Sequence, residues 1–409
     1  MNNQSKAYAI ILYLIWPFSA LWLGIKYFDF KFGKNLLIAL FGFLGFTALS
    51  HGDLERYEAS FYDLTGKDFS LIVADLFSLQ TGKFYNDFLS VVVGIFSNSH
   101  HVYFMLLFLI YGYFLVGSIS SFKSLKIKQH SRYGLLLFIA FALYYSVFNI
   151  LNLAFYTGGI FVIYSLIKYY NTQQKKYLYF IFLAPLFHLG LSLFVVVPLF
   201  VLVFKNKLLY YVIFLLFTFG LGQSNFVEVI ENIASSNSGT IIESKYKVYA
   251  SEKGRERMEK RYELGEQNAN IKLKTLFFFK DGIHYVLVPL GLVLLYFKRK
   301  TILYKYDLIR LFNLVLLTWG ISNLMLNISQ GERFLNIYCF LAIGLFYNVY
   351  VKTRGEITNT WLNKYLHVLM PTVLLTGFMT LLASHFMVSF IFFTSNFFIE
   401  IYKMAFALN

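Results

Sequence analysis

Long apolar stretches recur along the whole chain, and charged connections separate them. Each stretch has about 17 to 25 residues, enough for a helix to cross a hydrocarbon core of roughly 30 Å. Hydrophobic residues make up 58% of the 409 residues and charged residues only 14%, so a water-soluble protein of this size would lack the polar side chains to cover its surface. The pattern therefore predicts a membrane protein.

Backbone N–H and C=O groups must be satisfied inside lipid, so a spanning segment is either a helix or a strand of a closed barrel. Alternating strand patterns are absent, and the sequence predicts an all-α, polytopic helical membrane protein with about 12 transmembrane helices. The predicted spans are 7–25, 35–50, 101–119, 133–149, 152–168, 177–187, 189–204, 208–222, 283–297, 308–326, 334–350 and 366–383. A last apolar stretch, 386–402, is ambiguous.

The pair 177–187 and 189–204 holds too few residues for two full crossings. Between them lies "APLFHLG", which combines a proline, a histidine and a glycine in an otherwise apolar run. Proline and glycine interrupt helices and free backbone polar groups. We therefore expect a broken or re-entrant hairpin at this point.

Basic residues are distributed unevenly over the connections. The connections on one predicted side carry 20 of the 36 Lys and Arg residues but only Asp29, Asp307 and Glu356 of the 21 acidic ones. Such an excess marks the cytoplasmic side of a membrane protein. The net charge of +15 is then a topology signal, and nucleic acid is not expected as a partner.

Two long polar connections, 51–100 and 223–282, fall on the opposite, outer side. Neither has enough apolar residues for an independent core. We expect one transmembrane domain over residues 1–409, with these two loops forming a small amphipathic cap. Any chemistry is expected on this outer face, because the cytoplasmic loops are short and merely basic.

The first candidate stretch is "HGDLERYEASFYDL", residues 51–64. Asp53, Arg56 and Tyr57 lie at i, i+3 and i+4, so one helical turn would present a carboxylate, a guanidinium and a phenol together. The alternative is an interfacial helix with solvated charges.

In the second stretch, "FNILNLAFYTGG", Asn149 and Asn152 offer amide groups at the outer rim, unless the stretch is only a helix-hairpin turn.

The third stretch contains His188, whose polar ring is costly in an apolar run unless it has a partner or faces a cavity. A histidine bonded to a neighbouring carbonyl is the alternative.

The fourth stretch, "QGERF", places Glu332 and Arg333 at the outer end of the span 334–350. The helix dipole favours Glu332 there but opposes Arg333, unless an anionic ligand such as a phosphate lies between them; otherwise Arg333 extends to the lipid headgroups.

The loop 223–282 adds basic residues interspersed with acids, mostly a solvated helix face. Its "SKYKVYASEK" stretch has fewer acids, so Lys245 and Tyr249 are candidates for a second anion contact. The chain has no P-loop, GxSxG, HExxH or Rossmann pattern, and its single cysteine, Cys339, cannot form an internal disulfide or a thiolate zinc cluster. Neither a metal nor a cofactor is expected.

The order of these motifs over residues 50–350 resembles the EpsG-like branch of the Wzy polysaccharide polymerases. The resemblance implies a GT-C-like helical architecture in the bacterial inner membrane. It further implies that oligosaccharides linked to undecaprenyl diphosphate are joined on the outer face without nucleotide sugar or metal, with a possible chain-length regulator as protein partner. Many relatives have an arginine where this chain has Ala154, so Lys245 or an outer-loop arginine would have to substitute.

Cleavage of a glycosyl diphosphate releases an anion, which fixed guanidinium groups stabilise, and a carboxylate or imidazole can deprotonate the acceptor hydroxyl. The base is Asp53 or His188. The candidate catalytic residues are Asp53, His188 and Arg333, and the candidate substrate- and diphosphate-binding residues are Arg56, Tyr57, Asn152, Lys245, Tyr249 and Glu332. An O-antigen ligase or another GT-C glycosyltransferase is the alternative enzyme, and a lipid-linked oligosaccharide flippase or transporter is the alternative from another class.

Overall fold

The computed structural model shows an all-helical chain, which confirms the all-α part of the predicted fold class. Helices account for 85% of it, and the described residues contain no strand. The residues that the structure describes are 3–50, 53–78, 80–122, 139, 144, 153–221, 226–236, 239–249, 251, 256, 260, 271–326, 328, 330–353, 361–383 and 389–406.

The N-terminal region forms three helices, α1 (Asn3–Ile15), α2 (Ser19–Lys26) and α3 (Lys31–Phe46). The single span predicted over 7–25 is wrong, because the helix stops at Ile15 and restarts at Ser19. Pro17 lies in this break, and a proline cannot donate the backbone hydrogen bond that a continuous helix needs.

The centre of the bundle is α20 (Leu335–Thr353), which packs against α7 (His100–Phe122), α9 (Leu153–Thr172), α18 (Val288–Phe297) and α19 (Ile309–Met325). Every residue of 335–349 is buried. A helix that is apolar on all sides is expected in such a place.

The expected bend near residue 188 is present. A helical segment made of α10 (Lys176–Phe180), a 3-10 turn (Ile181–Leu183) and α11 (Ala184–Phe187) ends at His188, and a second segment made of η4 (Leu189–Val195) and α12 (Val196–Phe204) follows. His188 itself is extended, with φ −159° and ψ 127°. The prediction of a broken hairpin around "APLFHLG" is thereby confirmed.

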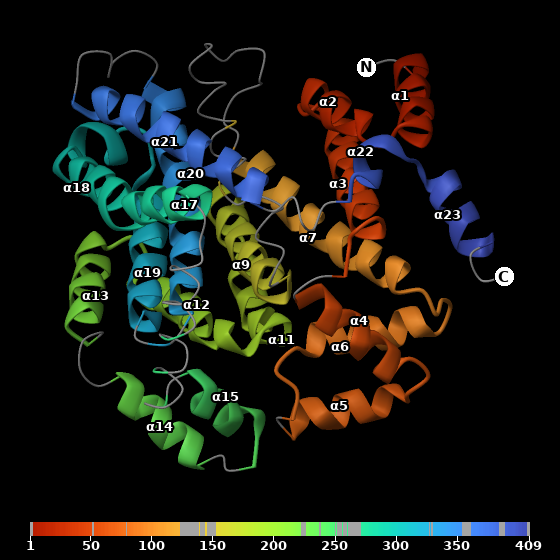
Figure 1. Cartoon of the computed structure of the whole chain (residues 1–409). Helices are drawn as coiled ribbons and strands as arrows, with labels where there is room; N and C mark the ends of the chain where they lie inside the picture. Colours follow the sequence, from red (N-terminus) through yellow and green to blue (C-terminus); the bar gives the residue numbers. More distant parts are fainter. Residues whose placement is uncertain are drawn as a thin grey trace.

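The two long connections fold into short helices. The first forms α4 (Asp53–Leu64), α5 (Phe69–Phe77) and α6 (Phe84–Gly94), and the part of the second before residue 250 forms α14 (Phe226–Ser236) and α15 (Ile241–Tyr249). Figure 1 shows all five in the lower part of the view. The Gln80 amide donates to the Gly239 carbonyl at 3.4 Å, so the two connections touch each other.

Three of the described helices are long and apolar enough to cross a membrane, at His100–Phe122, Lys274–Phe297 and Gly331–Thr353, as expected of a helical membrane protein. Four shorter apolar helices accompany them, and an array of about 12 spans is not confirmed. Most of the predicted span 133–149 lies outside the described residues. The remaining elements are α13 (Leu208–Leu221), α17 (Ile271–Asp281), the π-helices η5 (Gly282–Leu287) and η6 (Lys300–Tyr304), the 3-10 turn η7 (Gly331–Phe334) and α21 (Trp361–Ala383).

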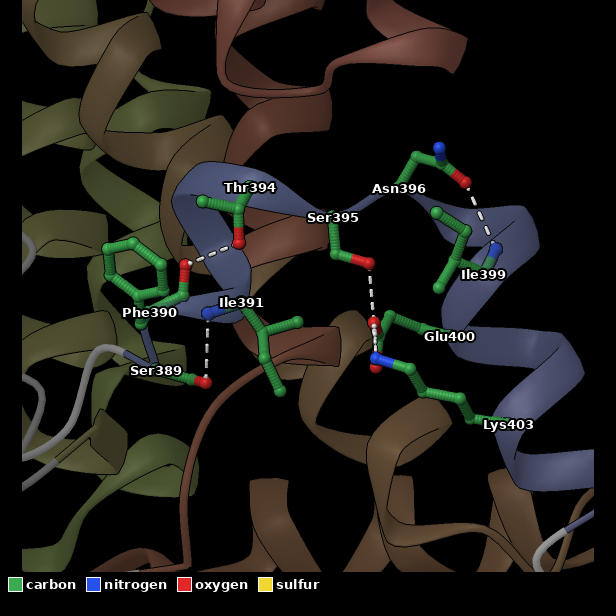
Figure 2. Close-up of polar contacts among 9 residues, drawn as sticks. All are labelled: Ser389, Phe390, Ile391, Thr394, Ser395, Asn396, Ile399, Glu400 and Lys403. Carbon is green, nitrogen blue, oxygen red and sulfur yellow. Dashed lines mark hydrogen bonds and ion pairs between the residues drawn. The ribbon is translucent and has the colours of Figure 1, made fainter.

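The ambiguous C-terminal stretch forms two short helices, α22 (Ile391–Thr394) and α23 (Phe397–Phe406), over its described part. Figure 2 shows Ser395 between them, with its hydroxyl directed at the Glu400 carboxylate that also pairs with Lys403. The Trp16 indole donates to the Phe393 carbonyl at 2.7 Å. This segment therefore packs on the N-terminal helices and does not form one spanning helix.

Candidate functional site

Tyr57 lies at the meeting point of three elements. Its side chain is buried on α4, and its hydroxyl accepts a hydrogen bond from the backbone N–H of Ala154 at the start of α9, with 3.4 Å between the atoms. The Lys83 ammonium lies 4.7 Å from the centre of the Tyr57 ring. One phenol thus joins α4, α9 and the residue that precedes α6.

Asp53 and Arg56 form an ion pair on the first turns of α4, as their i, i+3 spacing predicts. The Arg56 side chain is 73% exposed and the Asp53 side chain 12% exposed. Tyr57, the next residue, points inward. The helical turn therefore divides its polar groups, with Arg56 toward solvent, Asp53 at the edge and Tyr57 in the interior.

His188 lies where the hairpin contacts α9 and the loop before α6. Its Nδ1 accepts the backbone N–H of Gly190 at 3.0 Å, so in the neutral ring the proton resides on Nε2. The ring meets the edge of Phe155 at a centroid distance of 5.4 Å. The backbone N–H of Leu189 donates to the carbonyl of Gly82 at 3.2 Å. The hairpin thus holds the loop that carries Lys83.

Arg333 follows a tight turn that only glycine permits. Gly331 lies against the Met325 carbonyl, where a Cβ atom would overlap the oxygen, and Gln330 has a left-handed φ of 65°. The Ser322 hydroxyl donates to the Phe334 carbonyl at 2.9 Å. These contacts fix η7 at the start of α20 and leave the Arg333 side chain half-buried.

The guanidinium of Arg333 makes no hydrogen bond or ion pair within the part of the chain that the structure describes. Lys280, near the end of α17, lies within electrostatic range of Arg333, Asp281 and the exposed Glu332. Phe334, the residue after Arg333, packs on Phe155 at 4.9 Å. Phe155 therefore bridges the Arg333 turn and His188.

The positive charge of Arg333 acts on Tyr57 of α4. Burial raises the pKa of Tyr57, while the N–H of Ala154, the nearby Asn86 side chain and the positive charges of Arg56 and Arg333 act in the opposite direction. The structure thus brings Arg56, Tyr57, His188 and Arg333 to one region, although they come from three distant parts of the sequence.

Three predicted site residues fall, wholly or in their side chains, outside the part of the chain that the structure describes. Asn152 lies outside the described residues, as do the side chains of Lys245 and Tyr249. The backbone of Lys245 and Tyr249 is on α15, where Glu243 pairs with Lys247 at 2.6 Å. No described contact links that helix to Arg333.

Sequence reasoning missed the residues of α6 and the turn before it. Lys83 contacts Tyr57, and the Thr81 hydroxyl donates to the Asp87 carboxylate. Burial raises the pKa of Asp87, and the Thr81 hydrogen bond and the Lys83 charge oppose this. "TGKFYND", residues 81–87, matches no motif, and only its position in the outer loop could have drawn attention to it.

A second polar group that was missed lies inside the bundle. His284, on the π-helix η5, is buried, and its Nε2 lies 2.7 Å from the Tyr144 hydroxyl. The Tyr338 hydroxyl donates to the His284 carbonyl. The Asn336 amide donates to the Tyr156 hydroxyl at 3.4 Å and to the Arg333 carbonyl at 3.3 Å. π-helical turns are frequent at functional sites.

Among the described residues, no three His, Cys, Asp or Glu side chains are grouped closely enough to hold a metal ion. No family model matches the chain, and neither a curated protein nor a solved structure matches it. The geometry and chemistry of these residues are therefore the basis for assigning a function.

Proposed function

We propose that the chain is a bacterial polysaccharide polymerase. In this proposal it joins oligosaccharide units carried on undecaprenyl diphosphate, by glycosyl transfer on the outer face of the inner membrane. The reaction needs neither nucleotide sugar nor metal. A separate chain-length regulator is a possible protein partner, and the lipid bilayer surrounds the enzyme.

The proposal rests on the partial burial of the Arg333 guanidinium and on its lack of an acidic partner among the described residues. A half-buried guanidinium at the start of a helix opposes the helix dipole, and this one has no acidic partner among the described residues. A bound anion would satisfy both the guanidinium and the helix terminus. The diphosphate that leaves during glycosyl transfer is such an anion, and its charge grows in the transition state.

The proposed reaction assigns one role to each group. The acceptor hydroxyl attacks the anomeric carbon, the bond between that carbon and the diphosphate oxygen breaks, and the electron pair remains on the diphosphate beside Arg333. Asp53 takes the proton of the acceptor hydroxyl, because a carboxylate has further lone pairs besides the one that Arg56 occupies. His188 is a donor through Nε2, because its Nδ1 lone pair is engaged by Gly190.

The orientation is supported by contacts between cations and aromatic rings. Among the described residues, seven such contacts lie in or beside the connections assigned to the cytoplasm, where basic and aromatic side chains gather at the headgroup level. They are Lys26 with Tyr27, Lys34 with Phe28, Lys168 with Tyr164, Lys176 with Tyr177, Lys207 with Tyr210, Arg299 with Tyr296 and Lys305 with Tyr306. The site around Tyr57 lies at the opposite, outer ends of the predicted spans.

The test is chain extension in proteoliposomes supplied with lipid-linked oligosaccharide units. Arg333→Gln should lower the rate by about 100-fold or more, as expected when one stabiliser of a developing charge is removed. Arg333→Lys keeps the charge but loses the bidentate geometry, so a large loss is expected here too. Arg299→Gln, on the predicted cytoplasmic side, is the matched control. Unchanged polymer length with Arg333→Gln would exclude this role.

A flippase or transporter is the second candidate, and the buried His284 with its Tyr144 partner favours it. Ionisable residues inside a bundle commonly line transport paths. A sidedness assay separates the two functions, because a polymerase lengthens the glycan on one face, whereas a flippase moves it without lengthening. An O-antigen ligase would transfer the glycan to a different acceptor, and the product analysis of the same assay detects this.

A further inference from the structure

Asn86, in the first turn of α6, is a buried polar side chain without a partner. It is 3% exposed, and neither its Nδ2 nor its Oδ1 atom makes a hydrogen bond within the described residues. Its backbone carbonyl, in contrast, accepts from Ser90 and Tyr103. Buried polar groups are nearly always paired in native structures, so an unpaired carboxamide calls for a ligand or a water molecule.

A second unpaired group lies next to it. The Tyr85 hydroxyl is buried and makes no hydrogen bond among the described residues. Burial, together with Tyr103 and Tyr57 nearby, raises the pKa of Tyr85, so the hydroxyl keeps its proton and can donate. The first turn of α6 therefore presents two neutral groups, each able to donate and to accept.

This turn lies against the candidate site. The Tyr85 ring packs on Phe187 of the His188 hairpin at 4.7 Å, and Lys83 lies over Tyr57. The Asn86 side chain lies near enough to the Tyr57 hydroxyl to lower its pKa, but neither of its polar atoms reaches hydrogen-bond geometry. A ligand beside Arg333 can therefore extend across Tyr57 to α6.

The chemistry of the unpaired atoms selects the kind of ligand group. The Asn86 Oδ1 atom needs a hydrogen-bond donor and the Nδ2 atom needs an acceptor. An ionised phosphate only accepts, so it satisfies the amide nitrogen and leaves the oxygen unpaired. A sugar hydroxyl donates and accepts, and so do the neighbouring hydroxyls of one sugar ring.

We infer that the first turn of α6, with Tyr85 and Asn86, recognises the sugar that is attached to the diphosphate held beside Arg333. This inference rests on the proposed function, and it assigns the sugar contact to residues outside the predicted motifs. Both Asn86 atoms are covered in this structure, so the α6 turn has to shift when the sugar enters.

The test uses purified protein in nanodiscs with defined probes. Binding is measured for farnesyl diphosphate and for four farnesyl diphosphoryl sugars, carrying glucose, galactose, N-acetylglucosamine or N-acetylgalactosamine. The wild type should bind at least one sugar form about tenfold tighter than farnesyl diphosphate, the gain expected from one or two hydrogen bonds. Asn86→Leu should lose this gain and keep the affinity for farnesyl diphosphate, and Tyr85→Phe, which removes only the hydroxyl, should lose part of it.

Asn313→Leu is the matched control, because Asn313 on α19 is also buried with both carboxamide atoms unpaired. Both leucine variants should unfold at the same or a higher temperature, since each removes an unpaired buried group, but only Asn86→Leu should change sugar binding. The inference is overturned if no sugar form binds the wild type more tightly than farnesyl diphosphate, or if Asn86→Leu keeps the gain. The chain-extension assay tests the polymerase proposal separately. If chain extension is absent while the sugar forms still bind more tightly, the polymerase proposal fails and the sugar-binding inference stands.

Discussion

Tyr57 on α4 accepts its hydrogen bond from the backbone of Ala154, a residue 97 positions away at the start of α9. Ala154 is fully buried, and its backbone N–H is the donor of this hydrogen bond. The Lys83 ammonium lies over the ring of the same tyrosine, 4.7 Å from its centre. A lysine from the loop before α6 therefore places a cation beside the tyrosine that contacts the start of α9.

Lys83→Met should lower chain extension by about tenfold to 100-fold, because it removes a positive charge from the region proposed to hold the diphosphate. Protein yield and unfolding temperature should change little, because methionine can still pack on the Tyr57 ring. Lys67→Met, at an exposed position of the same loop, is the control. An undiminished rate for Lys83→Met would mean that Lys83 only packs on Tyr57.

Gly331→Ala should destabilise the protein by about 3 kcal/mol or more, since the added Cβ overlaps the Met325 carbonyl and the backbone must shift. Because Arg333 is two residues away, the same change should lower activity. Gly282→Ala, where nothing lies within 4 Å of the new atom, should be tolerated. Thermal unfolding in detergent measures both, and equal unfolding temperatures for the two variants would contradict the structure of this turn.

His188→Ala should cost about 1 kcal/mol of stability, because the backbone N–H of Gly190 loses the acceptor that begins η4. His188→Asn should recover most of this loss, since an asparagine side chain accepts such a bond well. His367→Ala, at an exposed position of α21, is the comparison, with a change within about 0.5 kcal/mol. The expectation fails if His188→Ala and His188→Asn are equally stable.

The raised pKa of Asp87 should make the free energy of unfolding fall as the pH rises. Its folded-state pKa is raised above the ordinary value of 3.8, so between the unfolded and folded pKa values the folded state holds more protons. Asp87→Asn mimics the protonated form and removes this dependence. Unfolding of the wild type and the variant between about pH 4 and pH 7 measures it. The advantage of the variant should grow with pH and then level off, and an advantage that grew toward low pH would refute the raised pKa.

Local properties of the sequence predicted the helical class, the bend at His188 and the pairing of Asp53 with Arg56. Apolar run length, the effect of proline and glycine on a helix, and i, i+3 spacing all act within a few residues. The division of the first span at Pro17 could have been read from the same signal. The number of spans also depends on how the helices tilt and pack, and the length of an apolar run carries no information on either.

The amino-acid sequence by itself thus determined that this chain is helical and apolar, and where polar residues interrupt its helices. Only the tertiary structure decided that Lys83 lies over Tyr57, that Asn86 is buried without a partner, and that His284 meets Tyr144. These residues belong to no sequence motif, and the residues that they contact are distant in the chain. His284 and Tyr144, for example, are 140 positions apart. Such proximity arises from packing of whole helices, and no local pattern records it.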